Sequence, residues 1–446
     1  MSKGNPNGAH RLSQKLADFT VNFSLPAAPA KALENAKLAI LDCLGVAALA
    51  ATQEVGVGLL KFASANTSPG PCTIWGNSQS VSPRDAALIN GTLAHGLDYD
   101  DRNHSTTYTL AASLAVTEQL NLSGAKMLAA FIVGREVRNS LDALFGRRSD
   151  GIGPGAKGWH SNGILGPIAA ACSAAHALSL SARETLAAIG LAAGSCGALT
   201  RDGGTMAKPF RTGHAAATGL TCALLAQSGF SSDDTAIEGP FGLLEALGPI
   251  PDDIVASLAG DLGVNFHLAH ELRIKPYASC TATHNGLEAM LRLARQHDLK
   301  PEAVASIECD QKPYPLVRQI PARGYEGRFS MAYCLAMTLI HRELKPDDFI
   351  DANVQQPLVQ ELMGRVRHTP GGPILVVNLK NGLRLEEKLQ TPSDLHGWDA
   401  VGAKFSAATF GIIDVTSGAA IIDQVKRLES LASIRSLTQL LKPSAV

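Results

Sequence analysis

Residues 32–51, ALENAKLAILDCLGVAALAA, decide the class of fold. Apolar residues recur in this stretch at intervals of three and four, which is typical of an α-helix with a buried face. The same texture returns at 83–97 (PRDAALINGTLAHGL), 166–180 (GPIAAACSAAHALSL) and 214–229 (HAAATGLTCALLAQSG). Alanine and glycine are frequent in all of these segments and permit helices to approach closely. The sequence from Leu12 to about Gly263 therefore predicts a helical bundle.

The texture of the sequence changes after Lys275. The segments VASIECDQ (304–311) and PILVVNLKNGLRLEEKL (373–389) alternate in the manner of strands, and the second carries an Asn-Gly hairpin turn. Between them, GRFSMAYCLAMTLIHREL (327–344) predicts a buried helix. We therefore expect a mainly α protein of two domains. These are a large all-helical domain from residues 1–269 with 396–446, and a smaller α+β lid domain from residues 270–395.

The composition of the 446 residues excludes some functions. Lys and Arg number 39 and Asp and Glu number 40, so the chain lacks the basic excess that binds nucleic acid. Only 18% of the residues are charged and 46% are apolar, which favours a protein that hides much surface, either in a deep core or in a subunit interface. The polar start MSKGNPNGAHRLSQ has no signal-peptide core, and no run of 18 apolar residues follows. We expect a cytoplasmic protein without a membrane segment.

The spacing of the cysteines and glycines does not indicate a zinc knuckle or a nucleotide-binding loop. The eight cysteines are scattered singly without a CxxC pair, which favours free thiols over a disulfide framework or a zinc knuckle. The glycine-rich stretch GIGPGAKGWHSNG (151–163) lacks the spacing of a nucleotide-binding loop, and Pro154 removes an amide donor.

The densest group of ionisable residues lies in GTLAHGLDYDDRNHS (91–105). If this stretch is helical, four of its members step by three residues and drift around the helix instead of forming a tight cage. The four are His95, Asp98, Asp101 and His104. Because no HExxH motif occurs elsewhere, we expect no metal site.

The three aspartates of this stretch have different expected roles. Asp100 and Asp101 form an adjacent pair, which is usually solvated or caps the following turn. Asp98 lies three residues from His95 between apolar and aromatic neighbours, and it is a candidate for acid/base chemistry.

Three further segments carry candidate groups. His160 follows the glycine-rich stretch and is either a cleft histidine with a tunable pKa or a hydrogen-bonded core histidine. Lys208 and Arg211 stand at the mouth of an apolar helix, where they either bind a substrate carboxylate or extend into solvent. Cys280 and His284 are four residues apart near the expected domain junction and could form a nucleophilic pair.

Five motifs occur in one order along the chain: HGLDYDD (95–101), GWHSNG (158–163), GTMAKPFRTGHAA (204–216), KPYASCTATH (275–284) and GRFSMAY (327–333). Together they resemble the 2-methylcitrate dehydratase family, also written MmgE/PrpD, over nearly the whole chain. The resemblance implies a homodimer with a large helical domain and a late-inserted lid. It also implies a site between the domains that needs no metal or cofactor and acts on small di- or tricarboxylates.

The resemblance also implies roles for single residues. Asp98 matches the family's active-site aspartate, His160 the histidine of its glycine-rich motif, and Lys208 and Lys275 its carboxylate-binding lysines. Lysines neutralise substrate carboxylates, while a histidine or aspartate moves the proton on the adjacent carbon. Two more residues in matching motifs, which we expect to bind substrate, are His284 and Tyr333.

The chain departs from the family after the aspartate motif. Dehydratases and decarboxylases usually continue as DDT and then reach a histidine, whereas this chain reads DDRNHSTTYT. Arg102 thus replaces the threonine and Tyr108 the histidine. We therefore predict an epimerase of an iminodisuccinate-like dicarboxylate, in which Tyr108 and His160 exchange protons on opposite faces of one carbon. Asp98 orients this pair, Arg102 binds substrate, and either Arg102 or a lysine lowers the pKa of Tyr108.

Two alternatives remain open. The first is a lyase that resembles 2-methylcitrate dehydratase or cis-aconitate decarboxylase, which are other members of the family. The second is a dimer of the same fold that has lost activity and serves only in binding. The partner expected for either enzyme is a small polycarboxylate.

Overall fold

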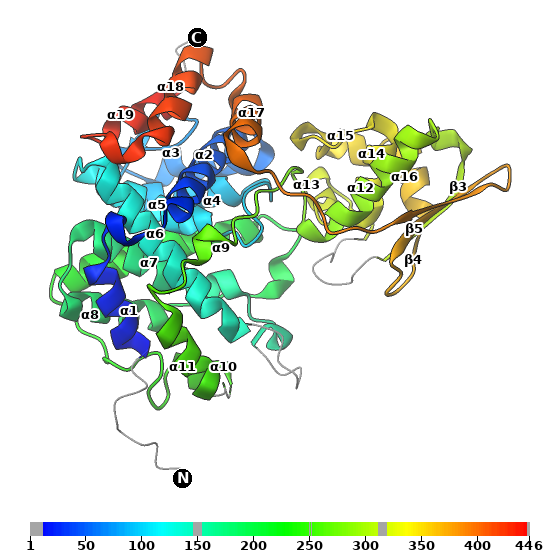
Figure 1. Cartoon of the computed structure of the whole chain (residues 1–446). Coiled ribbons are helices and arrows are strands. Elements are labelled where there is room, and N and C mark those ends of the chain that lie inside the picture. The colour runs from blue at the N-terminus through cyan, green and yellow to red at the C-terminus, as the bar shows by residue number, and fades with distance from the viewer. Residues whose placement is uncertain (1–11, 146–153, 249, 251, 311–318, 444–446) are drawn as a thin grey trace.

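The computed structural model describes residues 12–145, 154–248, 250, 252–310 and 319–443. The polar N-terminal residues 1–11 and the start of the glycine-rich stretch, 151–153, lie outside the described residues. The described chain forms a large helical lobe and a smaller lobe that carries a mixed sheet (Figure 1). The predicted mainly α, two-lobed architecture is confirmed at this level.

The large lobe is organised around two long helices, α7 (Ser161–Leu178) and α9 (Ala207–Gln227), which pack against each other. α4 (Pro83–His95) packs on α9, while α5 (Ser105–Gln119) and α6 (Gly124–Leu141) pack on α7. The remaining helices of this part of the chain are α1 (Leu12–Asn22), α2 (Ala30–Thr52), α3 (Glu54–Asn66), α8 (Ala182–Gly194), α10 (Leu243–Leu247) and α11 (Asp252–Asp261).

Two glycines bring α4 and α9 close together. A Cβ added to Gly91 would lie 2.9 Å from the Cα of Gly213, and one added to Gly213 would lie 2.1 Å from the carbonyl oxygen of Leu88. The helices cross this closely because neither position carries a side chain. The crossing sets the first turn of α9, with Lys208, beside the end of α4, with His95.

The C-terminal helices return to the large lobe. α17 (Gly397–Thr409) packs on α2 and is followed by α18 (Val415–Lys426) and α19 (Arg435–Thr438) (Figure 1). By length and composition alone α2 could cross a membrane, but 89% of its most apolar window is buried inside the protein. α2 is therefore placed as a core helix of the lobe.

The large lobe is not wholly helical, which corrects the expectation of an all-helical domain. β1 (Pro69–Thr73) and β2 (Ser80–Val81) pair as a short antiparallel ribbon between α3 and α4. The ribbon carries Cys72, whose thiol donates to the carbonyl of Ala115 in α5. It covers one end of the helical core.

The smaller lobe combines a four-stranded sheet with helices. The strand order is β4-β3-β5-β6, in which β3 pairs parallel with β4 and antiparallel with β5. The hairpin of β5 and β6 turns at the predicted Asn-Gly pair, where Gly382 has a φ of 88°. The elements are β3 (Val304–Cys309), β4 (Val366–His368), β5 (Ile374–Leu379), β6 (Arg384–Lys388), α12 (Thr281–Gln296), α13 (Gly324–Gly327), α14 (Met331–His341), α15 (Asp351–Val354) and α16 (Pro357–Gly364).

The chain crosses between the lobes at two neighbouring points. Ile274 on the way out and Leu395 on the way back pair with each other, and Ile274 also pairs with Asp101 of the large lobe. Both crossings therefore lie beside the loop that follows α4.

Candidate active site

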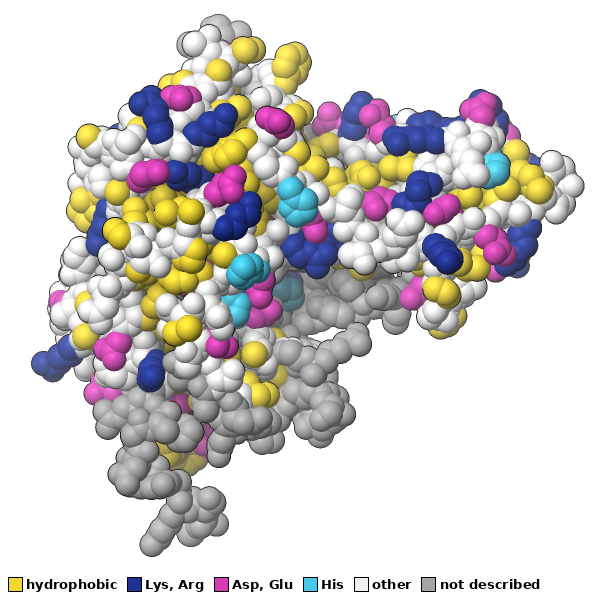
Figure 2. All heavy atoms as spheres, viewed as in Figure 1, with side chains coloured by type: hydrophobic (Ala, Val, Ile, Leu, Met, Phe, Trp, Pro, Cys, Tyr) yellow, Lys and Arg dark blue, Asp and Glu magenta, His cyan; other side chains and the backbone are white. Residues whose placement is uncertain are grey.

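A cavity of about 320 Å³ lies where the start of α12 faces the large lobe. Figure 2 shows histidine, basic and acidic side chains gathered near this junction of the two lobes. Larger hollows exist, such as one of about 830 Å³ beside α8, but among the described residues they carry no comparable group of buried charges. The cavity is lined by Asp98, Arg102, Asn103, His104, Arg138, Asp142, His160, Ser161, Asn162, Lys208, Cys280, Thr281 and Ala282.

The loop between α4 and α5 gathers much of this lining. α4 ends at His95 and α5 begins at Ser105, so the stretch is not one helix. Asp98 and His104 have φ values of 51° and 62°, and aspartate and histidine are among the residues that tolerate this left-handed region best. These two left-handed residues turn the loop back on itself. The ionisable side chains of the loop therefore converge, whereas on a helix they would point in different directions.

Asp98 holds two lysines. One carboxylate oxygen accepts from the ammonium group of Lys208 and the other from that of Lys275. Lys275 also donates to the backbone carbonyl of Asp98 at 2.8 Å. Burial raises the pKa of Asp98, but the two ammonium groups outweigh it and hold that pKa well below its ordinary value. Asp98 is therefore a carboxylate, at a point where two lysines converge on one anion.

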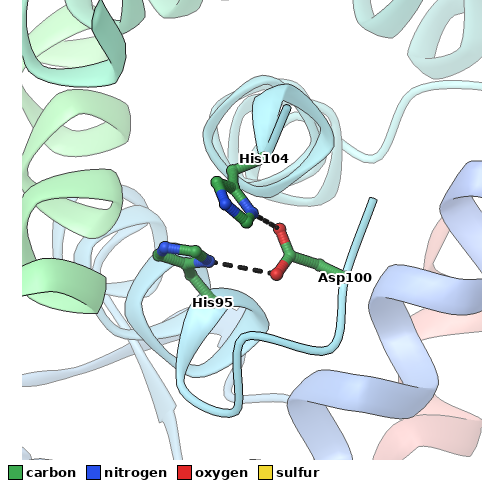
Figure 3. Close-up of side chains that lie close together, drawn as sticks. All are labelled: His95, Asp100 and His104. Atoms are coloured by element: carbon green, nitrogen blue, oxygen red, sulfur yellow. Dashed lines mark hydrogen bonds and ion pairs between the residues drawn. The ribbon is translucent and has the colours of Figure 1, made fainter. Parts of the chain in front are cut away.

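Asp100 lies between two histidines (Figure 3). Its carboxylate oxygens are 3.0 Å from Nδ1 of His95 and 2.9 Å from Nδ1 of His104. Burial raises the pKa of Asp100, and the two imidazoles outweigh this and lower it. Because an ionised carboxylate can only accept hydrogen bonds, both histidines donate from Nδ1. Each neutral imidazole then keeps its lone pair on Nε2.

The two Nε2 atoms face different groups. Nε2 of His95 accepts from the ammonium group of Lys208 at 3.0 Å. Nε2 of His104 lies 4.0 Å from a carboxylate oxygen of Asp98, and His104 lines the cavity. Burial lowers the pKa of both histidines, and Lys208 lowers it further, to about 3 for His95. His104 thus presents a proton acceptor to the cavity.

A metal ion could in principle be shared by three residues at the loop between α4 and α5, because one ligand atom of each lies within 4.8 Å of the others: His95, Asp100 and His104. Their polar atoms already have partners at hydrogen-bonding distance, because Asp100 accepts from both rings. The ammonium group of Lys208 beside His95 would also repel a cation. The geometry favours a hydrogen-bonded triad, and the expectation of a metal-free site stays a prediction.

His160 has the opposite tautomer to His104. Its Nδ1 accepts from the backbone N–H of Asn162 at 3.3 Å, so the neutral ring carries its proton on Nε2. Burial and the guanidinium of Arg211 hold its pKa well below the ordinary value. As the N-cap of α7 it is fixed at the start of that helix. One histidine of the lining can accept a proton, and the other can donate a hydrogen bond.

Arg138 of α6 occupies another part of the lining. Its guanidinium donates to Asp142 at 2.7 Å and lies 3.4 Å from both the Ser161 hydroxyl and the Asn162 side-chain oxygen. Tyr108 lies behind this group, with its hydroxyl 3.4 Å from the same oxygen of Asn162. Burial raises the pKa of Tyr108 to about 12. The expected lowering of this pKa is therefore wrong, and Tyr108 is outside the cavity lining.

Arg102 lines the cavity but directs its guanidinium to the returning chain. It donates to the carboxylate of Asp394 and to the carbonyl of Ser393 at 2.8 Å. Its backbone N–H donates to the carbonyl of Arg273 at 2.9 Å. In this structure Arg102 joins the lobes, whereas the expectation was that it contacts substrate and Tyr108.

Asp100 and Asp101 are both buried, so the reading of solvated carboxylates is wrong. Asp101 accepts from the backbone N–H of Thr106 at 3.3 Å, which satisfies the first turn of α5, and from Arg135 at 2.5 Å. Asp101 thus caps the first turn of α5, which was the second of the two roles expected for this aspartate.

His284 and Tyr333 lie outside the cavity lining. Nε2 of His284 is 3.1 Å from the carbonyl of Ser279, and burial lowers the pKa of His284 to about 3. The Tyr333 hydroxyl donates to the carbonyl of Asp348 at 2.5 Å inside the smaller lobe. Burial raises the pKa of the Cys280 thiol, and His284 does not bond to it. These placements do not support substrate binding by His284 or Tyr333, nor a Cys–His nucleophile.

Lys404, a buried lysine of α17, bonds to the backbone of the loop between α4 and α5. The ammonium group of Lys404 in α17 donates to the carbonyls of Tyr99 at 2.6 Å and Lys275 at 3.0 Å, and pairs with Asp42 of α2 at 2.6 Å. Burial raises the pKa of Asp42 to about 6, although Lys404 opposes the shift. Lys404 therefore fixes the backbone next to Asp98 and at Lys275.

Sequence reasoning missed His104, Asp100 and Arg138. His104 and Asp100 stood in the most charged stretch, and the signal was their place in a loop of acidic and histidine residues. Arg138 gave no signal, because it is one of two arginines on a helix and only the fold shows which neighbours it meets.

The fold and the site together define an enzyme-like, two-lobed protein that places lysines and histidines around a small cavity. The model of the MmgE/PrpD N-terminal domain matches residues 14–252, and that of the MmgE/PrpD C-terminal domain matches residues 277–371. The chain belongs to the MmgE/PrpD family.

Curated relatives match over most of their length. Cis-aconitate decarboxylase of Mus musculus is 27% identical over 450 residues, which cover 93% of this chain and 90% of the relative. The Homo sapiens protein of the same name is 26% identical over 448 residues, with 92% and 90% covered. That of Aspergillus terreus is 26% identical over 393 residues, with 81% and 78% covered. These relatives support the expectation of an enzyme.

Proposed function

We propose that this chain is a lyase acting on small polycarboxylates, with decarboxylation of cis-aconitate or a close analogue as its reaction. The relatives that match over most of both chains bear the name cis-aconitate decarboxylase. They favour the lyase alternative over the epimerisation of an iminodisuccinate-like compound. Tyr108, the second proton-transfer group on which epimerisation depended, is outside the cavity lining, and burial raises its pKa.

The observation that carries the proposal is the convergence of Lys208 and Lys275 on the carboxylate of Asp98, with His104 beside it. Two ammonium groups at one buried point can stabilise the negative charge that develops on a substrate carboxylate. His104 is close enough to move a proton at the adjacent carbon. Lys208 and His104 thus offer charge stabilisation and proton transfer in one small cavity, and Lys275 adjoins it through Asp98.

Decarboxylation of cis-aconitate needs both of these functions. The carboxylate that leaves as carbon dioxide sits on the methylene carbon next to the double bond. Its C–C electron pair forms a new C=C bond, and the pair of the old double bond moves to the far alkene carbon. That carbon bears a carboxylate, which takes up the charge as an enolate until a proton adds to the carbon. The lysines would stabilise the enolate, and a protonated His104 would supply the proton.

Substrate binding would prepare His104 for this step. In the resting site, burial and the charges of Lys208 and Lys275 lower the pKa of His104, while Asp100 raises it. A substrate with several carboxylates brings negative charge next to the lysines and so raises the pKa of His104. The imidazole can then take a proton from water before it protonates the substrate carbon.

Dehydration of a hydroxy-tricarboxylate is the second candidate. The resting tautomer of His104 favours it, because the lone pair on Nε2 is ready to remove a proton next to a carboxylate. The N–H of His160 on Nε2 could donate a hydrogen bond to the departing hydroxyl group, which would leave as water with the proton that His104 removed. The homodimer and the cytoplasmic location expected from the sequence remain part of the proposal.

A panel of substrates separates these reactions. The purified chain is incubated with cis-aconitate, 2-methylcitrate, citrate and the two enantiomers of aspartate-derived iminodisuccinate, and the products are identified by proton NMR. We expect carbon dioxide and an unsaturated dicarboxylate from cis-aconitate. An unsaturated tricarboxylate formed from a hydroxy acid would indicate the dehydratase, stereoinversion alone would indicate the epimerase, and no conversion would contradict the proposal.

A further inference from the structure

We propose that Arg138 and the N-terminus of α7 form a second carboxylate-binding subsite, which selects substrates that carry another carboxylate beyond the one held by the lysines. The identity of the ligand as a polycarboxylate rests on the proposed function. Neither the family match nor the names of the relatives assign a role to Arg138.

Arg138 is buried but poorly partnered. Its exposed fraction is 2%, and its Nε has no hydrogen-bond partner among the residues that the structure describes. The contacts of its Nη2 with Ser161 and Asn162 are both 3.4 Å long, beyond the usual range for such bonds. A buried guanidinium normally satisfies its five donors, so this side chain has donor capacity left for an anion at the cavity.

The second contribution comes from α7. This helix of 18 residues begins at Ser161, and its first residues, Ser161 and Asn162, line the cavity together with Arg138. The N-terminus of a helix carries partial positive charge and favours anions. The Ser161 hydroxyl, which lies within 3.4 Å of Arg138, adds a donor at the same place.

The groups behind Arg138 hold it in position. The side-chain oxygen of Asn162 lies 3.4 Å from both Arg138 and the hydroxyl of Tyr108. Although burial lowers the pKa of Arg138, Tyr108 and Asp142 outweigh it and raise that pKa, so the group stays charged. Tyr108, expected to move protons, would thus help to position the arginine.

Asp142 marks where a substrate carboxylate would bind. It is the close anion of Arg138, at 2.7 Å, and its side chain is 57% exposed. A carboxylate on a flexible, solvent-exposed side chain can move aside when a ligand carboxylate takes its place. Asp142 would therefore compete with the ligand for Arg138.

The subsite is tested by isothermal titration of the full-length protein with propane-1,2,3-tricarboxylate, which cannot undergo the reaction. Arg138→Gln should weaken binding by about 10- to 100-fold, because a charge-assisted contact is lost. Arg138→Lys should recover part of the affinity, since it keeps the charge but not the planar fork. Asp142→Asn should tighten binding several-fold. Circular dichroism checks that each variant is folded.

Each outcome bears on the subsite. Unchanged affinity in folded Arg138→Gln, or weaker binding in Asp142→Asn, would overturn it. If Arg138→Gln fails to fold, Arg138→Lys and the exposed Asp142→Asn still decide the question. If the tricarboxylate binds through Arg138 but no substrate is turned over, the subsite stands and the proposed lyase activity is contradicted. If a substrate is turned over but binding does not depend on Arg138, the lyase activity stands and the subsite is contradicted. Failure of the wild-type protein to bind the tricarboxylate would contradict both.

Discussion

The cavity has two ends that are built differently. The lysine end is defined by Asp98, Lys208 and His104, which line the cavity, and by Lys275 and Asp100, which bond to them from outside the lining. Each of these groups has a close partner, and all but His104 are buried. The arginine end is defined by Arg138, Asp142 and Ser161. There the contact of Arg138 with Ser161 is long, at 3.4 Å, and its close partner Asp142 is exposed.

The contrast separates two tasks. A charged cluster whose members hold each other in place is preorganised, which suits the stabilisation of charge during a reaction. A charged group with spare donors and a solvent-exposed competitor suits exchange with a ligand. We infer that the lysine end carries out the chemistry and that the arginine end contributes affinity and selectivity.

The largest effect is expected from Asp98→Asn. The substitution leaves Lys208 and Lys275 buried without their counter-ion, and breaking a buried ion pair in this way costs about 3–5 kcal/mol of stability. Activity should fall below detection. Urea unfolding gives the stability, and Asp142→Asn, the same chemical change at a carboxylate that is 57% exposed, should alter it less, because Arg138 keeps its contacts with Ser161 and Asn162. Equal stabilities of the two variants would contradict the view that the lysine end of the cavity is held together more tightly than the arginine end.

His104→Gln should reduce kcat by about 100- to 10,000-fold, which is the usual contribution of a positioned acid or base. Affinity for propane-1,2,3-tricarboxylate should change little, because the lysines and Arg138 remain. Steady-state kinetics and titration separate the two quantities. His284→Gln is the matched control, since His284 is a buried histidine outside the lining, and its kcat should stay near the wild-type value. A normal kcat in His104→Gln would exclude His104 as the proton carrier.

The pH dependence tests the protonation state of His104. Decarboxylation needs the protonated ring, and burial lowers the pKa of His104 below its ordinary value of 6.5 in the free enzyme. The kcat/KM profile should therefore fall as pH rises through a midpoint below 6.5. Asp100→Asn removes a charge that raises this pKa and should move the midpoint to lower pH. Activity that rises with pH over the same range would indicate a base, and hence dehydration.

The smallest effect is expected from Arg102→Gln. Arg102 joins the lobes through Asp394, and Asp394 keeps Arg273 as a second partner when Arg102 is lost. KM should rise a few-fold with kcat almost unchanged. Arg273→Gln, which removes the other, more exposed partner of Asp394, should have a still smaller effect. A large loss of kcat in Arg102→Gln would place this arginine at the reacting atoms.

The helical lobe and the hairpin could be predicted because their signals are local. The three- and four-residue periodicity of α2 and α9 and the Asn-Gly turn at Gly382 depend only on neighbours in sequence. The ribbon of β1 and β2 was missed because it is short and rich in proline and glycine.

The site could be predicted only in part. Asp98, His160 and Lys208 followed from motifs and line the cavity together. The triad around Asp100 depends on two left-handed residues in one loop, and nothing in the sequence distinguishes such a loop from a helix end. Tyr108 was assigned by its offset from Asp98, yet α5 directs it to the core behind Arg138. Offsets along a chain do not show which side chains reach a cavity.

The most direct test of the central claim is carbon-13 and proton NMR of the wild-type protein with carboxyl-labelled cis-aconitate in deuterated water. We predict one equivalent of labelled carbon dioxide for each unsaturated dicarboxylate formed, with one deuterium on the carbon that receives the proton. Hydration to a hydroxy acid, exchange without loss of carbon dioxide, or no reaction would contradict the assignment of this chain as a polycarboxylate decarboxylase.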